Sequence, residues 1–188
     1  MLVIRAFTDA SVRWKTETLC DSSSAMILTI NNSIIEVSRE TKFHENCTSN
    51  YGEMYAIFLA MNAIETFMNG SGLTKDDCII EIISDSNLCV QSLNNWIYSW
   101  RKYMKDGKLY KKTGELVANQ EIVQLAFKLL HRNNAKIYHI NSHITPKNLS
   151  KSFDKFCNSY GLIPMEMFIK FTEYNEKVDK LAKSVFRE

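Results

Sequence analysis

The sequence feature that most constrains the fold is an apolar run near the start of the chain that ends on a carboxylate. Residues 2–8 place apolar side chains on both faces of an extended strand, and Asp9 follows directly. This pattern is typical of a central strand that is buried on both sides. An isolated Asp after a strand usually begins a turn. Asp9 therefore indicates a functional site only if other carboxylates converge on it.

A second strand of the same kind occurs further along the chain. Residues 79–84 are mostly apolar, and Asp85 follows them. Between the two strands, residues 50–69 are rich in Ala, Met, Leu and Ile, which predicts a long helix. Because a strand, helix and strand in succession pair in parallel through a crossover, we expect Asp9 and Asp85 to meet at one edge of the sheet.

Two more acids lie within predicted helices. At about 100° per residue, Glu53 falls on the same helix face as Ile57 and Ile64, the face that must pack on the sheet. A carboxylate on a buried face needs a partner or a metal ion. Asp179 lies in a final helix predicted for residues 175–186.

The other expected elements follow from hydrophobic periodicity and from turn residues. After Asp9 we expect a polar loop as far as Ser23, and Asn31 and Asn32 predict a tight turn between two strands. Ser86 is placed to cap the helix that follows Asp85. The predicted ranges are strands at 25–30, 34–41 and 136–140, and helices at 86–100, 119–131, 146–160 and 164–171.

Composition narrows the class of protein. With 188 residues and 45% hydrophobic residues, the chain is long enough for one good core, and we predict a single domain over residues 1–188. A net charge of +2 does not by itself indicate a nucleic-acid partner. The five cysteines are odd in number and lack Cys-x-x-Cys spacing, which argues against disulfides and zinc. Without a membrane span or a leader peptide, we expect a cytoplasmic monomer with no membrane partner.

Four acids brought together would repel one another without a counter-charge. Carboxylate oxygens are hard ligands that suit Mg²⁺ or Mn²⁺. Two such ions about 4 Å apart activate a water and stabilise the leaving oxygen in phosphodiester hydrolysis. The sequence thus predicts a metal site formed by Asp9, Glu53, Asp85 and Asp179.

The segments that carry these acids resemble the type 1 ribonuclease H family, in the same order along almost the whole chain. The matching segments are FTDAS, CTSNYGEMYAIFLAM, ISDSN, NNWIYSWRK, LVANQEI and NEKVDKLAK. The resemblance implies an α/β ribonuclease H-like fold, with a five-stranded mixed sheet in the order 3-2-1-4-5 and helices on both sides. It also implies endonucleolytic cleavage of the RNA strand of an RNA–DNA hybrid, leaving 5′-phosphate and 3′-hydroxyl ends.

The resemblance assigns roles at the catalytic site. Asp9 would bridge two Mg²⁺ ions (or Mn²⁺), Glu53 and Asp85 would bind one of them, and Asp179 the other. His143 matches the His of the family that assists proton transfer or product release. From the residues alone, a single loop His is more often just exposed to solvent.

A basic segment provides the main electrostatic feature of the chain. Residues 101–112 contain six basic residues and one acid, interleaved with tyrosines. Such a run is commonly only a solvated surface, but neighbouring aromatic residues favour contacts with phosphates and sugars. The resemblance implies that this segment is a protrusion that binds the DNA strand, and that Trp96 lines a DNA channel. It also implies a DNA phosphate pocket at Thr48 and Asn119, an RNA contact at Asn50, and a nucleic-acid contact at Asn87, where the family often has Gln. The basic residues predicted to bind nucleic acid are Arg101, Lys102, Lys108, Lys111 and Lys112.

The sequence departs from the family pattern at two places, and it is compatible with two other functions. Ala10 occupies a position where the family commonly has Gly, and residues 144–174 replace a short loop. The apolar content of this insertion predicts that it folds, either as a helical subdomain beside the acids or as a cover over a distant part of the core. The alternative functions are another nuclease or transposase-like enzyme of the same fold, and a non-catalytic module that binds hybrids.

Overall fold

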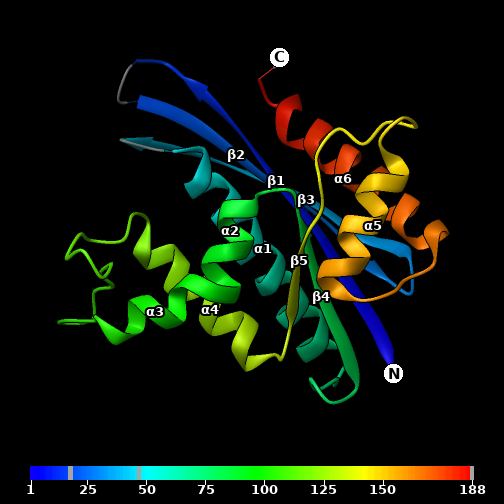
Figure 1. Cartoon of the computed structure of the whole chain (residues 1–188), viewed down its shortest axis with the longest axis horizontal. Coiled ribbons are helices and arrows are strands. Elements are labelled where there is room, and N and C mark those ends of the chain that lie inside the picture. The colour runs from blue at the N-terminus through cyan, green and yellow to red at the C-terminus, as the bar shows by residue number, and fades with distance from the viewer. Residues whose placement is uncertain (17–18, 46–47, 187–188) are drawn as a thin grey trace.

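The computed structural model describes residues 1–16, 19–45 and 48–186, which form an α/β fold with one mixed sheet (Figure 1). The five strands lie in the order β3-β2-β1-β4-β5, with β1, β2 and β3 antiparallel and with β4 and β5 parallel to β1. This order confirms the predicted sheet. The strands are β1 (Leu2–Trp14), β2 (Leu19–Ile30), β3 (Ser33–Glu45), β4 (Cys78–Ser84) and β5 (Lys136–His139).

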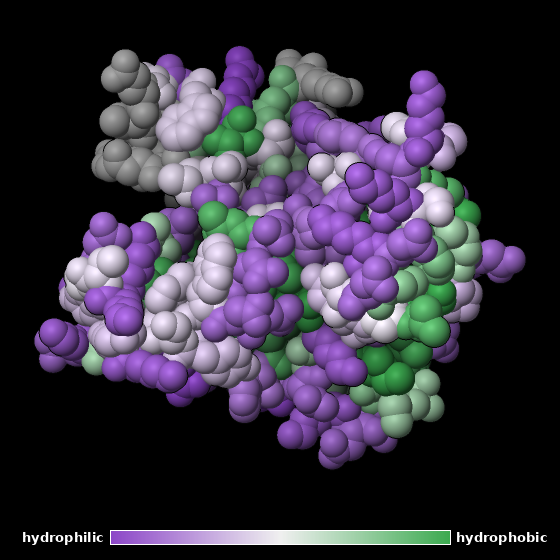
Figure 2. Space-filling model, viewed as in Figure 1, coloured by the Kyte–Doolittle hydropathy of each residue, from purple (hydrophilic) through white to green (hydrophobic). Residues whose placement is uncertain are grey.

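Helices cover both faces of this sheet. They are α1 (Ser49–Gly70), α2 (Asn87–Gln91), α3 (Ile97–Lys102), α4 (Gln120–Arg132), α5 (Leu149–Tyr160) and α6 (Met165–Ser184), and a π-helical turn (Ser92–Trp96) joins α2 to α3. Among the described residues, none of these helices is both long enough and apolar enough to cross a membrane. The face of the molecule drawn in Figure 2 is mostly hydrophilic, as expected when most apolar side chains are packed inside.

The central strand β1 contributes to a hydrophobic core on each face of the sheet. Ile4 and Ala6 belong to the core beneath α1 and α4, whereas Phe7 belongs to the core beneath α5 and α6. Strand β4 divides its side chains in the same way, with Ile82 in the first core and Ile83 in the second. Since successive side chains of a strand point to opposite faces, this division confirms that both strands are buried on both sides.

Strand β1 does not end at Asp9, so the predicted polar loop up to Ser23 is wrong. β1 continues to Trp14 and pairs with β2 as far as Cys20. The pairing of β1 with β4 stops at Thr8 and Ser84. Beyond this point β1 bonds to β2 alone and leaves the centre of the sheet, where polar residues are compatible with a strand. The apolar run in the sequence therefore ends where β1 stops pairing with β4, and the strand itself continues.

The tight turn between β2 and β3 is confirmed. Asn31 and Asn32 have φ angles of 47° and 70°. Two successive residues with positive φ are characteristic of the type I′ hairpin turn, in which Asn is tolerated. The predicted strand at 34–41 is correct but too short, because β3 extends from Ser33 to Glu45.

Helices α2 and α4 begin within one residue of their predicted starts. The side chain of Ser86 accepts a hydrogen bond from the Cys89 N–H and caps α2. The π-helical turn that follows was not predicted. The side chain of Asn94, within this turn, donates a hydrogen bond to the Ile137 carbonyl at 3.0 Å and ties the turn to β5. The helix predicted for residues 119–131 corresponds to α4, with Asn119 at its N-cap.

The segment 144–174 contains α5 and the first half of α6. The two helices predicted at 164–171 and 175–186 are one helix, because no Pro or Gly interrupts Met165–Ser184. Phe156 of α5 and Phe168 of α6 are buried with Phe7 in the second core. The insertion therefore covers one face of the sheet, and its helix α5 also borders the acid-bearing edge through the pocket described below.

Candidate active site

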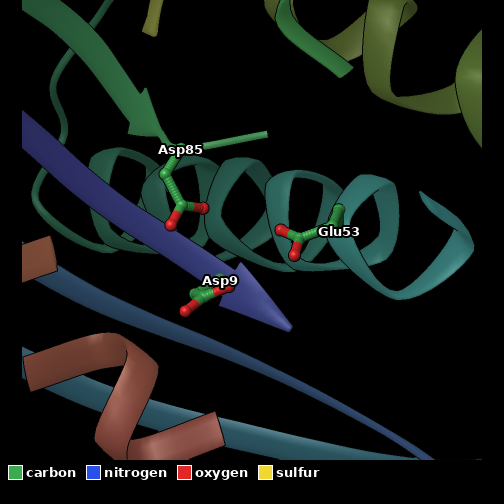
Figure 3. Close-up of side chains that lie close together, drawn as sticks. All are labelled: Asp9, Glu53 and Asp85. Atoms are coloured by element: carbon green, nitrogen blue, oxygen red, sulfur yellow. The ribbon is translucent and has the colours of Figure 1, made fainter. Parts of the chain in front are cut away.

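Three carboxylates meet at the edge of the sheet where β4 ends. Asp9 and Asp85 directly follow the last parallel pair, Thr8 and Ser84, so they lie side by side. Glu53 reaches them from the second turn of α1. One oxygen atom from each of the three carboxylates lies within 4.8 Å of the other two. Figure 3 shows the three side chains directed toward one another from β1, α1 and the end of β4.

Gly52 allows α1 to approach the strands closely enough to deliver Glu53. A Cβ atom at position 52 would lie 2.4 Å from Ser22 Oγ and 3.0 Å from Ala10 Cβ, both shorter than normal contacts. The Ser24 hydroxyl donates a hydrogen bond to the Gly52 carbonyl at 2.8 Å and fixes this contact. Sequence reasoning missed Gly52, although a glycine directly before the acid of a long helix is the signal that marks it.

Burial and mutual repulsion both raise the pKa values of the three acids. Asp9 is only 4% exposed, and its burial together with the charge of Asp85 raises its pKa to about 8. Burial and the nearby Asp9 raise the pKa of Glu53 well above its usual value. Burial also raises the pKa of Asp85. The cluster therefore favours either bound protons or a bound cation.

The geometry fits a divalent cation of the hard type. The Ala10 N–H donates to Asp9 Oδ1 at 2.7 Å, but among the described residues the buried Glu53 Oε2 has no hydrogen-bond partner. A buried carboxylate oxygen without a partner is costly, and a metal ion relieves this cost. The donor set consists of carboxylate oxygens, which suits Mg²⁺ or Mn²⁺.

Asp179 lies near this cluster but outside the group of three. Its charge contributes to raising the pKa values of Asp9 and Asp85. Its own Oδ1 forms an ion pair with Lys183 Nζ at 2.6 Å, one turn further along α6. In this structure Asp179 is thus paired with a cation of its own helix.

Asn175 and His139 contact Asp85 and were both missed by sequence reasoning. Asn175 is 4% exposed on α6, and its Nδ2 lies 3.5 Å from Asp85 Oδ2. His139 Nε2 lies 3.1 Å from the Asp85 carbonyl oxygen, and burial lowers the pKa of this imidazole. The available signals were an Asn within the apolar face of the last helix and a His at the end of a buried strand.

His143 is exposed in the loop after β5, with φ 51°. Within the part of the chain that the structure describes, no hydrogen bond or ion pair joins His143 to the acids. The structure therefore does not bring His143 into the cluster.

The residues predicted to bind a DNA phosphate do lie together. Asn119 Nδ2 donates to Thr48 Oγ1 at 3.2 Å, and these residues are the N-caps of α4 and α1. Trp96 is 43% exposed, with its ring centroid 6.0 Å from that of Trp100. Trp96 is thus available to a ligand, while Trp100 packs against the first core.

The basic segment forms the end of α3 and an irregular loop. Lys102, Lys108 and Lys112 are exposed, whereas Lys111 pairs with Glu115 at 2.9 Å. Arg101 lies over the Phe127 ring, 5.7 Å from its centroid. The remaining predicted contacts lie near the acids: Asn87 is exposed at the start of α2, and Asn50 lies in the first turn of α1.

Comparisons with known proteins agree with this arrangement. The model of the RNase H family matches residues 3–187. A Ribonuclease H of Tropheryma whipplei strain Twist is 39% identical over 64 residues, which is 34% of this chain and 37% of that protein. The matched stretch is thus about a third of the length of this curated relative.

Solved structures show the same fold at low sequence identity. Native prototype foamy virus protease-reverse transcriptase aligns with a TM-score of 0.58 and 16% identity, over 97% of this chain and 20% of that chain. A foamy viral protease-reverse transcriptase in complex with RNA/DNA hybrid aligns with a TM-score of 0.51 and 15% identity, over 85% of this chain and 20% of that chain.

Proposed function

The chain belongs to the ribonuclease H family, and on that premise we propose that it is a metal-dependent endonuclease that hydrolyses the RNA strand of RNA–DNA hybrids. The observation that carries this proposal is the cluster of the buried Asp9 with the half-buried Glu53 and Asp85, in which the buried Glu53 Oε2 has no hydrogen-bond partner among the described residues. A protein that only bound nucleic acid would gain nothing from three clustered carboxylates that repel one another.

Asp9, Glu53 and Asp85 would hold Mg²⁺, and Asp179 would join them after releasing Lys183. Two bound Mg²⁺ ions would supply an activated water and stabilise the charge that develops on the leaving oxygen. Mn²⁺ would serve with the same oxygen ligands. The ion pair between Asp179 and Lys183 is the contact that this rearrangement must break.

The chain's own residues would orient the acids. The Ala10 N–H holds one oxygen of Asp9, and Asn175 lies against Asp85. These contacts limit the rotation of two ligands, which is how an active site keeps its geometry before substrate arrives. His143, on the exposed loop, would assist proton transfer or product release from outside the cluster, as the family pattern implies.

The hybrid would lie across the acids with its DNA strand toward α3. Exposed Lys102, Lys108 and Lys112 would meet DNA phosphates, and Thr48 with Asn119 would hold one more. On the other strand, Asn50 and Asn87 would contact RNA near the cut, where the 2′-hydroxyl distinguishes RNA from DNA. A foamy viral protease-reverse transcriptase, part of which shares this fold, was solved in complex with an RNA/DNA hybrid, which supports a hybrid as the substrate.

Cleavage of end-labelled duplexes tests the proposed function. We expect Mg²⁺-dependent cutting of the RNA strand in an RNA–DNA hybrid, and no cutting of double-stranded DNA or double-stranded RNA of the same sequence. EDTA should abolish the reaction. Equal cutting of all three duplexes would indicate a different nuclease, and tight hybrid binding without cleavage in Mg²⁺ or Mn²⁺ would indicate a binding module.

A further inference from the structure

A pocket of about 350 Å³ lies beside Asp85, on the side away from the basic segment. Its walls come from the start of α2, the end of β5 and helix α5, so it exists only because residues 144–174 fold as they do. His139 lines the pocket and also contacts the Asp85 carbonyl oxygen, at 3.1 Å. In Figure 1, α3 and α5 lie on opposite sides of α2.

The polar lining of the pocket consists of hydrogen-bond donors and one cation. Its amide and hydroxyl groups come from Asn87, Asn141 and Ser152, among others, and its cation is Lys155. None of the residues that line it carries a carboxylate. A site that combines an ammonium group with neutral donors and excludes acids is suited to a phosphate group.

Lys155 is held by a neutral hydrogen-bond partner. Its Nζ donates to Asn141 Oδ1 at 3.2 Å, and Asn141 Nδ2 lies 3.3 Å from Ser152 Oγ. Among the described residues Lys155 forms no ion pair with a carboxylate. The amide of Asn141 thus positions the ammonium group without neutralising it.

The pocket is built on rigid elements. Phe156 and Phe168 form its inner wall and are buried in the second core. The Tyr160 hydroxyl accepts a hydrogen bond from the His139 N–H at 2.9 Å and ties α5 to β5. The volume is at the lower end of the range of ligand pockets, about 300–1,000 Å³, which suits one sugar–phosphate unit.

We propose that this pocket binds a backbone phosphate of the RNA strand close to the cleavage position, so that α5 extends the hybrid-binding surface beyond the acids. The inference rests on the proposed function. A hybrid whose DNA strand meets α3 would present its RNA strand over Asp85 and toward α5, the helix that forms one wall of the pocket.

Hybrid affinity without divalent metal, measured for Lys155→Ala, tests this proposal. We expect the Kd to rise about tenfold, the loss of one charged hydrogen bond. The slope of log Kd against log salt should fall by about one, as for one phosphate contact. Lys151→Ala is the matched control, because Lys151 is exposed one turn earlier on α5 and does not line the pocket. Lys155→Arg should retain most of the affinity.

Replacing hybrid phosphates one at a time by neutral methylphosphonates then locates the contact. We expect one position of the RNA strand to weaken binding to the wild type but not to Lys155→Ala. The proposal is overturned if Lys155→Ala binds like the wild type, if Lys151→Ala loses as much affinity, or if the lost contact maps to the DNA strand. If the pocket binds only free phosphate or a mononucleotide, Lys155→Ala should bind the hybrid with unchanged affinity.

Wild-type cleavage measured in the same series separates this inference from the proposed function. If the wild type cleaves the hybrid and Lys155→Ala binds the hybrid with wild-type affinity, only the pocket assignment is contradicted. If Lys155→Ala loses a contact with the RNA strand but the wild type does not cleave the hybrid, only the proposed activity is contradicted.

Discussion

Asp9 is placed so that its ionisation opposes folding when no metal is bound. Its pKa of about 8 in the folded chain compares with 3.8 for an unperturbed Asp. Between these values the folded state holds a proton that the unfolded state has released, so stability must fall as pH rises through this window. The slope for one proton is about 1.4 kcal/mol per pH unit.

We therefore predict that the metal-free protein melts at a lower temperature at pH 8.5 than at pH 5.5, and that Asp9→Asn weakens this dependence. Glu53 and Asp85 preserve part of the slope because their pKa values are also raised. Thermal unfolding in EDTA at both pH values measures the effect. Asp76→Asn, a change at an exposed residue away from the cluster, should keep the full wild-type slope; an identical slope in Asp9→Asn would contradict the electrostatic argument.

Gly52→Ala should both destabilise the fold and displace Glu53. The added methyl would meet Ser22 Oγ and Ala10 Cβ at less than normal contact distance. Such overpacking typically costs about 1–3 kcal/mol. We expect a lower melting temperature and a lower cleavage rate at fixed Mg²⁺, with part of the rate restored by higher Mg²⁺.

Gly70→Ala is the matched control for this change. Gly70 is the last residue of α1, and a Cβ there meets nothing within 4 Å. Normal stability and activity in Gly52→Ala would show that α1 can shift without cost, contrary to the packing described.

The candidate site was predictable from sequence where the signal is local, and not where it depends on packing. Asp9 and Asp85 follow apolar runs, and Glu53 interrupts an apolar helix face, so periodicity predicts the positions of all three and their convergence. Asn175 and His139 acquire their roles only through contacts with Asp85, 90 and 54 residues away in sequence. Contacts between residues so far apart in the sequence cannot be predicted from a local sequence pattern.

At the scale of elements, the basic segment should determine affinity and not the chemical step. We predict that changing Lys108, Lys111 and Lys112 together to Gln raises KM and reduces its salt dependence, with kcat nearly unchanged. Lys111 should contribute least, since it already pairs with Glu115. Steady-state cleavage at several salt concentrations measures this.

A control variant that removes two lysines comes from the opposite end of the sheet. Lys75 precedes β4 and Lys136 begins β5, so both lie away from the acids at the strand ends. Changing these two lysines to Gln should alter KM little. A collapse of kcat in the triple variant with KM unchanged would instead place the basic segment in the chemical step.

Element types were predictable more often than element lengths. The long helix α1 and the Ser86 cap followed from composition and capping residues. The extension of β1 past Asp9 did not, because its polar residues are stabilised by pairing with β2, a contact between distant segments. The π-helical turn at Ser92–Trp96 likewise depends on the bond from Asn94 to β5.

At the scale of the whole molecule, two cores on opposite faces of one sheet hold the acid cluster from both sides. α1 presents Glu53 from one face, while α6 presents Asn175 against Asp85 from the other. The family resemblance implied helices on both faces, and the sequence left two alternatives for where residues 144–174 would pack. Their apolar residues indicate a folded segment. The sheet face that this segment covers depends on Phe7 and Ile83, which among the described helices pack in one core with α5 and α6.

The measurement that bears most directly on the account is the single-turnover rate of hybrid cleavage in Mg²⁺ for the wild type, Asp9→Asn and Asp76→Asn. If Asp9, Glu53 and Asp85 hold the catalytic metal, Asp9→Asn should lower the rate by at least about a thousandfold, since losing one ligand disturbs the whole site. Asp76→Asn should cleave at the wild-type rate, and circular dichroism should show all three folded. Near-normal cleavage by folded Asp9→Asn would contradict the central claim.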